Sequence, residues 1–304
     1  SAITRIQSLP LKGEGGEEVK KESLKIVKKW LKLKRTSGPP ELLPGIEALG
    51  KIGDRRAVGP LIDMLQETYT RAVSALALGR IGDRKAVPFL KEALRKEKQD
   101  SIKMSLEAAL YLLGDKSEWE LLVNNLKKEK LRLGAIRLLG EIGNKQGIKP
   151  LLEALSDKSP EVRAEAIKAL SQIGRGGKAT EEALQKALND NNPEVKKEAI
   201  LAVVKSGKTT KALQGILRDK GEELSVRLAA ASRLGGWGDK SGLPLALRVA
   251  EGKTFSDGER AMALTALGRI GKEKTILRKI YQNKDESYLM RFDARQALQG
   301  KEGR

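Results

Sequence analysis

The chain has 304 residues, with 59 Lys and Arg against 40 Asp and Glu, so its formal net charge is +19. It contains no cysteine and no histidine. These absences exclude disulfides, thiolate metal sites and cysteine nucleophiles, and they remove the commonest general base and transition-metal ligand. We therefore expect no metal site and no cofactor. The hydrophobic fraction of 39% is enough for a core, but no apolar run is long enough to predict a membrane-spanning helix.

The first 40 residues differ from the rest of the chain. Residues 1–16 show no periodic pattern, and we expect an extended or disordered arm there. Residues 17–37 combine apolar and basic positions at helical spacing, which predicts a basic amphipathic helix that caps the following domain. Gly38 and the two prolines after it separate this helix from residues 41–300, which we interpret as one elongated domain.

Within residues 41–300 a glycine recurs at intervals of 29 to 33 residues. An aliphatic residue stands four positions before each of these glycines, and a small residue stands eight positions before seven of them. Such positions share one face of a helix, so each glycine is predicted to end a first helix in a left-handed conformation. The closing glycines, as we name them, are Gly53, Gly82, Gly114, Gly143, Gly174, Gly207, Gly238 and Gly271.

Helix start signals recur with the same period. Ser159 and Asn192 each precede a proline and a glutamate, which is typical of an N-cap before the first helical turn. After each closing glycine the pattern predicts a short turn and a second helix. The expected fold is all-α: a right-handed α-solenoid of about eight stacked helical hairpins, with an N-terminal capping helix and a C-terminal half repeat at 290–298. We expect the second helices to line its concave face.

The segment 162–174, Val-Arg-Ala-Glu-Ala-Ile-Lys-Ala-Leu-Ser-Gln-Ile-Gly, resembles the first helix of a HEAT-like repeat, in the short form also found in phycobilisome lyases. Similar units cover roughly residues 41–300. The resemblance implies an α-solenoid scaffold. A di-iron hydroxylase of this repeat class uses paired His-Glu motifs, which a chain without histidine cannot supply. A DNA glycosylase of the class would call for an aromatic pocket, whereas the three tryptophans here are widely separated.

A cation stands eleven residues before most closing glycines, and we name this set the basic ladder. In HEAT-like arrays an equivalent side chain commonly reaches an acidic or backbone group of the adjacent repeat. This implies a structural role, which we favour over a row of ligand-binding cations. The ladder consists of Arg71, Lys103, Arg132, Arg163, Lys196, Arg227 and Arg260.

A second set of cations follows the closing glycines, and we name it the turn row. Cations at the start of a helix oppose its dipole by about 0.3–1 kcal/mol each, which makes a binding role more plausible here than in the ladder. The alternative is that these are solvated turn residues. Trp119, in a predicted second helix, belongs either to the core or to the binding face. The turn row consists of Arg55, Arg56, Arg84, Lys85, Lys116, Lys145 and Lys240.

Three functions remain open from these patterns. The leading hypothesis is a non-enzymatic, monomeric scaffold that presents a basic surface to an acidic protein partner. The alternative is nucleic-acid binding through phosphate-backbone contacts, and an anionic membrane surface is a further possible partner. The third is a HEAT-scaffold enzyme such as a lyase or a DNA glycosylase. Because the chain starts at Ser1 and its first methionine is Met64, we expect a processed or trimmed product, and cytoplasmic and exported locations both stay open.

Overall fold

The computed structural model describes residues 21–22, 24–25, 42–174, 177–271 and 274–299. The expected arm at 1–16 and most of the expected capping helix at 17–37 lie outside the described residues. Of that segment, Leu24 is buried and packs in the core beside the first repeat. The described chain is all-α, without a strand among its described residues, and none of its described helices is both long and apolar enough to cross a bilayer. The prediction of an all-α solenoid is confirmed.

The chain forms two compact units, residues 1–147 and 148–304. In unit 1 the first helices alternate with shorter second helices, several of them preceded or followed by a 3-10 turn. The helices are α3 (Leu42–Ile52), α4 (Val58–Asp63), α5 (Thr68–Ile81), α6 (Val87–Lys96), α7 (Asp100–Leu112), α8 (Glu118–Asn124) and α9 (Glu129–Ile142). The 3-10 turns are η1 (Arg55–Ala57), η2 (Met64–Gln66), η3 (Arg84–Ala86), η4 (Asn125–Lys127) and η5 (Lys145–Gly147).

Unit 2 continues the same alternation. Its described helices are α10 (Ile148–Ala154), α11 (Pro160–Ile173), α12 (Lys178–Ala187), α13 (Pro193–Ala202), α14 (Gly207–Arg218), α15 (Leu224–Gly236), α16 (Leu243–Glu251), α17 (Asp257–Ile270), α18 (Lys274–Gln282) and α19 (Tyr288–Gln299). The last of these, α19, is a first helix that packs on α17 and α18.

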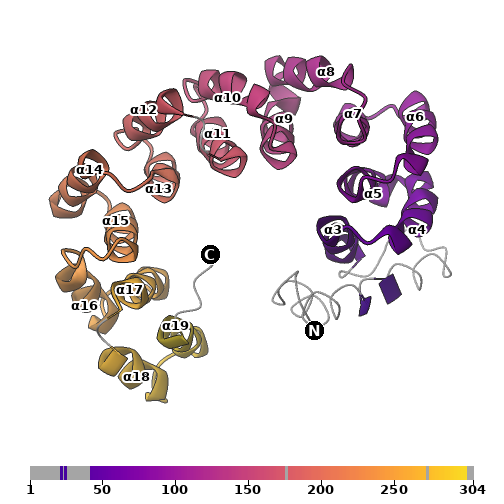
Figure 1. The fold of residues 1–304 in the computed structure, drawn as a ribbon. Coiled ribbons are helices and arrows are strands. Elements are labelled where there is room, and N and C mark those ends of the chain that lie inside the picture. The colour runs from indigo at the N-terminus through magenta and orange to yellow at the C-terminus, as the bar shows by residue number, and fades with distance from the viewer. Residues whose placement is uncertain (1–20, 23, 26–41, 175–176, 272–273, 300–304) are drawn as a thin grey trace. The chain divides into compact units, whose positions relative to one another are not determined.

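Within each unit the first helices form one layer and the second helices form the other (Figure 1). In unit 1 the layer of α3, α5, α7 and α9 lies on the inside of the curve, and α4, α6 and α8 lie on the outside. Unit 2 has the same arrangement, with the odd-numbered helices inside. The expectation that second helices line a concave face is therefore wrong. The reason is that first helices carry the small residues and approach one another closely, whereas the second helices are held further apart.

Consecutive first helices approach each other closely at glycines that stand three positions before the closing glycine. A Cβ on Gly50 would lie 2.7 Å from the Cα of Ala77, and one on Gly79 would lie 2.8 Å from the Cα of Ala109. Gly268 meets Ala297 in the same way, at 3.1 Å. These glycines let consecutive first helices pack backbone against backbone, which bends each unit toward its first-helix side.

Seven of the eight closing glycines adopt a positive φ, between 70° and 105°. Gly207 is the exception, and its assignment as a closing glycine is wrong. Helix α13 ends early, the backbone at Val203 is extended, and Gly207 is the first residue of α14. Ser206 starts α14 through a capping box with Thr209, whose backbone N–H donates to the Ser206 hydroxyl at 3.1 Å. This local start signal outweighs continuation of α13 across β-branched residues.

Candidate binding surface

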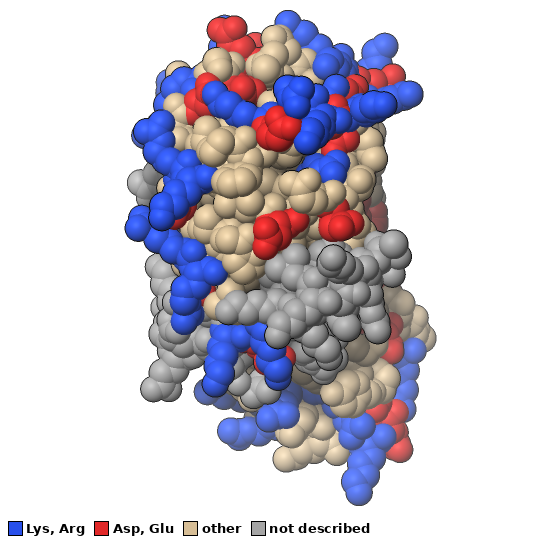
Figure 2. Space-filling view, turned by 90° about the vertical axis from the view of Figure 1, so that its right-hand side faces the viewer, with Lys and Arg blue, Asp and Glu red and all other residues tan. Residues whose placement is uncertain are grey.

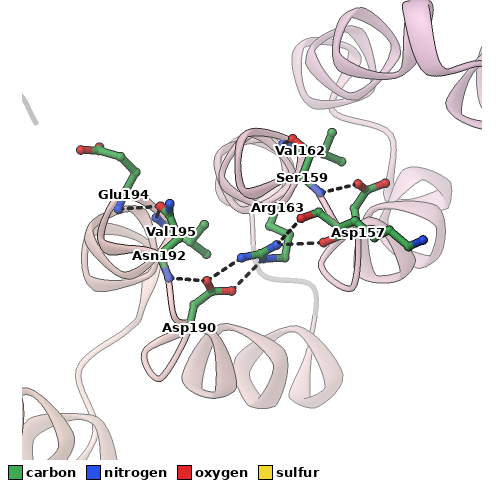
Figure 3. A network of polar contacts seen from close by, with 9 residues as sticks. Asp157, Ser159, Val162, Arg163, Asp190, Asn192, Glu194 and Val195 are labelled. Carbon is green, nitrogen blue, oxygen red and sulfur yellow. Dashed lines mark hydrogen bonds and ion pairs between the residues drawn. The ribbon is translucent and has the colours of Figure 1, made fainter.

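The basic ladder is largely neutralised by contacts between consecutive repeats. Arg163, on α11, donates from Nε and Nη2 to both carboxylate oxygens of Asp190, at 2.8 and 2.7 Å, and from Nη1 to the carbonyl of Asp157 (Figure 3). Asp190 also accepts from the backbone N–H of Asn192, which caps the next first helix. The Arg163 guanidinium holds the pKa of Asp190 below its usual range. One side chain therefore ties the start of α11 to the start of α13.

The same bridge recurs along both units. Arg260 binds both oxygens of Glu286 at 2.8 Å and the carbonyl of Ala250 at 3.1 Å, and it lowers the pKa of Glu286. Arg71 pairs with Glu97 and donates to two carbonyls, while Lys196 pairs with Glu222. The other three members are Lys103, which lies 3.8 Å from Asp100, Arg132, which donates to the carbonyl of Leu126, and Arg227, which donates to the carbonyl of Leu217.

The turn row has a different environment. Its members lie in the turns between first and second helices, and their side chains are exposed, as the ladder's are not. Asp54 and Asp83 cap the turns η1 and η3 by accepting from the backbone N–H two residues later, and Asp54 also pairs with Arg56. The exposed turn cations are Arg55, Arg56, Arg84, Lys85, Lys116, Lys145 and Lys240.

Lys116 and Trp119, which the sequence analysis singled out, both lie against Tyr111 in the third repeat. The rings of Trp119 and Tyr111 lie 5.1 Å apart at an angle of 40°, and the Lys116 ammonium lies 4.7 Å from the centre of the Tyr111 ring. The side-chain amide of Asn144 donates to the Tyr111 hydroxyl. Trp119 is half-buried, so it contributes to both the core and the surface. Tyr111 stands where most repeats have the close-packing glycine, a departure that is visible in the sequence.

The same repeat contains a polar centre that the sequence interpretation missed, made of the half-buried Glu107 and Glu118 and the buried Asn125. Glu107 stands seven residues before its closing glycine, where the other repeats have Ile46, Ala75, Ile136, Ile167, Ile200, Ala231 and Leu264, all fully buried. Glu118 stands four residues after the glycine, where the first two repeats have buried alanines. Asn125 is also buried, and its amide lies 3.5 Å from a Glu107 carboxylate oxygen, a long hydrogen bond.

Burial is the main cause that raises the pKa of both carboxyl groups. The charge of Glu107 raises the pKa of Glu118 further, whereas Lys128 and Lys103 partly offset the shift at Glu107. The Oε2 atom of Glu118 is buried without a hydrogen-bond partner among the described residues. Burial and the neighbouring negative charge thus both favour the protonated form of Glu118. The described residues contain no group of three or more acidic, histidine or cysteine side chains placed to hold a metal ion.

Large apolar side chains are exposed beside the turn row on the outer layer of unit 1. Phe89 on α6 is 47% exposed and Leu121 on α8 is 49% exposed. Both stand seven residues after their closing glycine, so they occupy equivalent places in adjacent repeats. Figure 2 shows the right-hand side of Figure 1, where Lys and Arg side chains gather in a column along the left edge and border an uncharged area of the described surface. We name Phe89, Leu121, Arg84, Lys85 and Lys116 the outer patch.

Residues 45–111 and 120–183 match the family model of HEAT repeats. No curated protein matches the chain. Among solved structures, the CpcE–CpcF complex of phycocyanin lyase from Nostoc sp. PCC7120 is 20% identical and covers 80% of this chain and 93% of that one, with a TM-score of 0.39. Human deoxyhypusine hydroxylase is 18% identical (84% and 98% covered, TM-score 0.34). Importin beta is 11% identical (93% and 53% covered, TM-score 0.37). The predicted HEAT-like resemblance is confirmed.

Proposed function

We propose that this chain, two segments of which match HEAT repeats, is a non-enzymatic scaffold whose outer patch binds an acidic protein surface. The observation that carries the proposal is the exposure of Phe89 and Leu121 at equivalent places of adjacent repeats, with exposed turn cations beside them. Protein interfaces commonly combine an apolar centre with a charged rim. The cations of the rim select an acidic partner and steer its approach.

The distribution of charge around the patch supports an acidic partner. Helix α6 adds Lys91, Arg95 and Lys96 to the turn cations and carries one carboxylate, Glu92. Lys91 is paired with Asp115 at 2.9 Å, and α8 brings Glu118 and Glu120 near Leu121 in sequence. Glu92 is itself paired with Arg95 and Lys96. The cations of the basic ladder, by contrast, form ion pairs and hydrogen bonds with carboxylates and carbonyl groups of the chain itself. The turn row and α6 therefore account for much of the cationic surface that unit 1 offers to a partner.

The apolar pair favours protein over nucleic acid as the partner. Binding to phosphates needs cations that track the backbone, and it draws no benefit from an exposed phenylalanine and leucine side by side with them. Binding of single strands would use aromatic platforms for stacking, whereas Trp119 and Tyr111 are packed against each other and largely buried. Nucleic-acid binding is the alternative outcome of the test below.

The test compares capture of partners by the immobilised wild-type chain and by the double variant Phe89→Ala/Leu121→Ala. We expect the double variant to lose the captured acidic proteins, because truncation of central apolar contacts typically costs about 1–2 kcal/mol each. Leu201→Ala is the matched control, since Leu201 is 48% exposed on α13 of unit 2. Fluorescence polarisation with duplex DNA and RNA at two salt concentrations tests the alternative. Equal capture by all three proteins, together with tight salt-sensitive nucleic-acid binding, would overturn the proposal.

A further inference from the structure

Arg227 differs from Arg71, Arg163 and Arg260 of the ladder in what surrounds it. The carboxylates that pair with ladder cations stand 26 or 27 residues further along the chain. At these separations from Arg227 stand Lys253 and Thr254. Within the described chain Arg227 forms no ion pair, and its Nε donates to the carbonyl of Leu217 at 3.1 Å. The repeat that starts at α15 therefore lacks the acid that neutralises the same position elsewhere. The pairs that define the pattern are Arg71–Glu97, Arg163–Asp190, Lys196–Glu222 and Arg260–Glu286.

A cavity of about 350 Å³ opens at Arg227, between α14, α15 and α16 of unit 2. Two further arginines line it, Arg218 at the end of α14 and Arg248 on α16, and both are exposed. The lining contains no carboxylate. Its other members are Leu217, Ser241, Pro244 and Leu245.

Asp239 stands two residues before the lining residue Ser241, and its carboxylate is already engaged. Asp239 accepts from the backbone N–H of Ser241 at 2.8 Å and from the Gln214 amide at 2.7 Å. Hydrogen bonds from Ser241 are the main cause that lowers the pKa of Asp239, and the charge of Arg218 adds to them. Asp239 thus offsets part of the charge of Arg218, but Arg227 and Arg248 stay without an acidic partner among the described residues. A partly buried cation such as Arg227 attracts an anion when no acid of the chain neutralises it.

We propose that this cavity binds a side-chain carboxylate of an acidic peptide segment, which takes the place beside Arg227 that Asp190 holds beside Arg163. The geometry of the other repeats supports a carboxylate, because Asp190 and Glu286 each receive two guanidinium hydrogen bonds at 2.7–2.8 Å. Such bidentate pairing is among the stronger charge-assisted contacts. Arg218 and Arg248 give a neighbouring acidic side chain of the same segment a second contact.

The proposal rests on the proposed function in one respect, namely that the partner is acidic. It uses a different surface, in unit 2, and it can fail separately. Loss of peptide binding at the cavity with an intact outer patch would overturn the cavity proposal alone. Capture of partners that does not depend on Phe89 and Leu121, with peptide binding intact, would overturn the outer patch alone.

The experiment titrates the full chain with fluorescein-labelled hexaglutamate at physiological salt, with hexaglutamine as the uncharged probe. We expect Arg218→Gln/Arg248→Gln to weaken binding about tenfold, because both side chains line the cavity and their loss removes two cationic contacts to the peptide. The control Lys279→Gln/Lys284→Gln removes the same charge from exposed positions of unit 2 and should change affinity less than about twofold, as expected for exposed charges.

A gain-of-carboxylate variant gives the sharper test, because it does not depend on removing an arginine. Thr254→Asp places an acid at the separation that Asp190 has from Arg163. We expect it to occupy Arg227 from within the chain and to abolish hexaglutamate binding, while Thr254→Asn leaves binding unchanged. Equal affinity of these two variants would overturn the proposal. Displacement of the peptide by inorganic phosphate at lower concentration than by glutarate would also overturn it, in favour of a phosphorylated ligand.

Discussion

The polar centre of the third repeat lowers the stability of unit 1 at neutral pH, and this is the prediction with the clearest physical basis. Glu107 and Glu118 occupy adjoining core positions. In the seventh repeat the equivalent residues are Ala231 and Gly242, and a Cβ on Gly242 would lie 2.5 Å from the Ala231 Cβ. Two ionised carboxylates at this contact repel each other and lose hydration, so the triple variant Glu107→Ile/Glu118→Ala/Asn125→Ala should be more stable than the wild type.

The magnitude follows from what the substitution removes and adds. Replacing buried charged groups by well-packed apolar residues commonly stabilises a protein by about 1–4 kcal/mol. Because Glu107 and Glu118 are half-exposed and screened by solvent, we expect the lower end, about 1 kcal/mol. Asn125 is included because it would otherwise lose its hydrogen bond to Glu107 and remain buried and unsatisfied. A gain of this size should raise the melting temperature of unit 1 by about 2–4 °C for each kcal/mol.

The pH dependence gives a second readout with a definite sign. The pKa of both carboxyl groups is raised in the folded chain, so the folded state binds their protons more readily than the unfolded state. Their penalty is absent below the unfolded pKa of about 4.3 and grows as the pH rises through the folded pKa. The advantage of the triple variant should therefore be larger at pH 8 than at pH 4.

Thermal unfolding followed by circular dichroism at pH 4 and pH 8 measures both effects. Glu120→Ala is the matched control, because Glu120 is an exposed carboxylate on the same helix α8. We expect the control to change the melting temperature by less than about 1–2 °C, as for most surface substitutions. A triple variant that is no more stable than wild type, or whose advantage is the same at both pH values, would refute the assignment of Glu107 and Glu118 as a repelling pair.

Three further predictions concern the ladder and the close helix contacts. Arg163→Ala should lower the free energy of unfolding by about 2–3 kcal/mol in urea titrations, because it leaves Asp190 and two carbonyls without their donor; a change below 0.5 kcal/mol would contradict a structural role. The lowered pKa of Asp190 has the opposite sign to the polar centre: the stability it contributes is present above the unfolded pKa of about 3.9 and is lost as the pH falls through the folded value, so Asp190→Asn should reduce the loss of stability seen on acidification. Gly79→Ala should cost about 1–3 kcal/mol, since its Cβ would meet the Ala109 backbone, whereas Gly215→Ala has open space in α14 and should stabilise by about 0.5–1 kcal/mol; equal effects in thermal unfolding would count against the close contact.

Helix order and the ends of most first helices could be predicted from the sequence because the signals were local. A closing glycine such as Gly82 needs no tertiary partner to favour a left-handed cap, and Ser159 caps α11 from its own side chain. The prediction that Gly207 ends a first helix failed because Ser206 starts α14 through a capping box with Thr209. The signal for a helix end and the signal for a helix start fall on the same few residues. The concave layer was assigned to the wrong helices because curvature depends on how closely neighbours approach, as Gly79 does to Ala109.

The site residues also differ in whether a local signal or tertiary packing determines their position. Proximity of Lys116 and Trp119 to Tyr111 could not be predicted from spacing alone, because it depends on how α7 and α8 pack. The departures of Glu107 and Tyr111 from the repeat pattern, however, were already visible in the sequence.

A repeat protein supplies its own reference for what each position does when it serves only stacking. Arg163, with Asp190 and two carbonyls around it, shows how a ladder cation is satisfied within the chain. Arg227 has the same place in its helix, but the residue 27 positions further along the chain is Thr254 instead of a carboxylate. If this position served stacking alone, the missing acid would only lower the stability of the fold, because a partly buried guanidinium is stabilised by an anion. An acid supplied by a partner removes that cost only when the partner is bound, so the same contact that stabilises a neighbouring repeat elsewhere would here stabilise a complex.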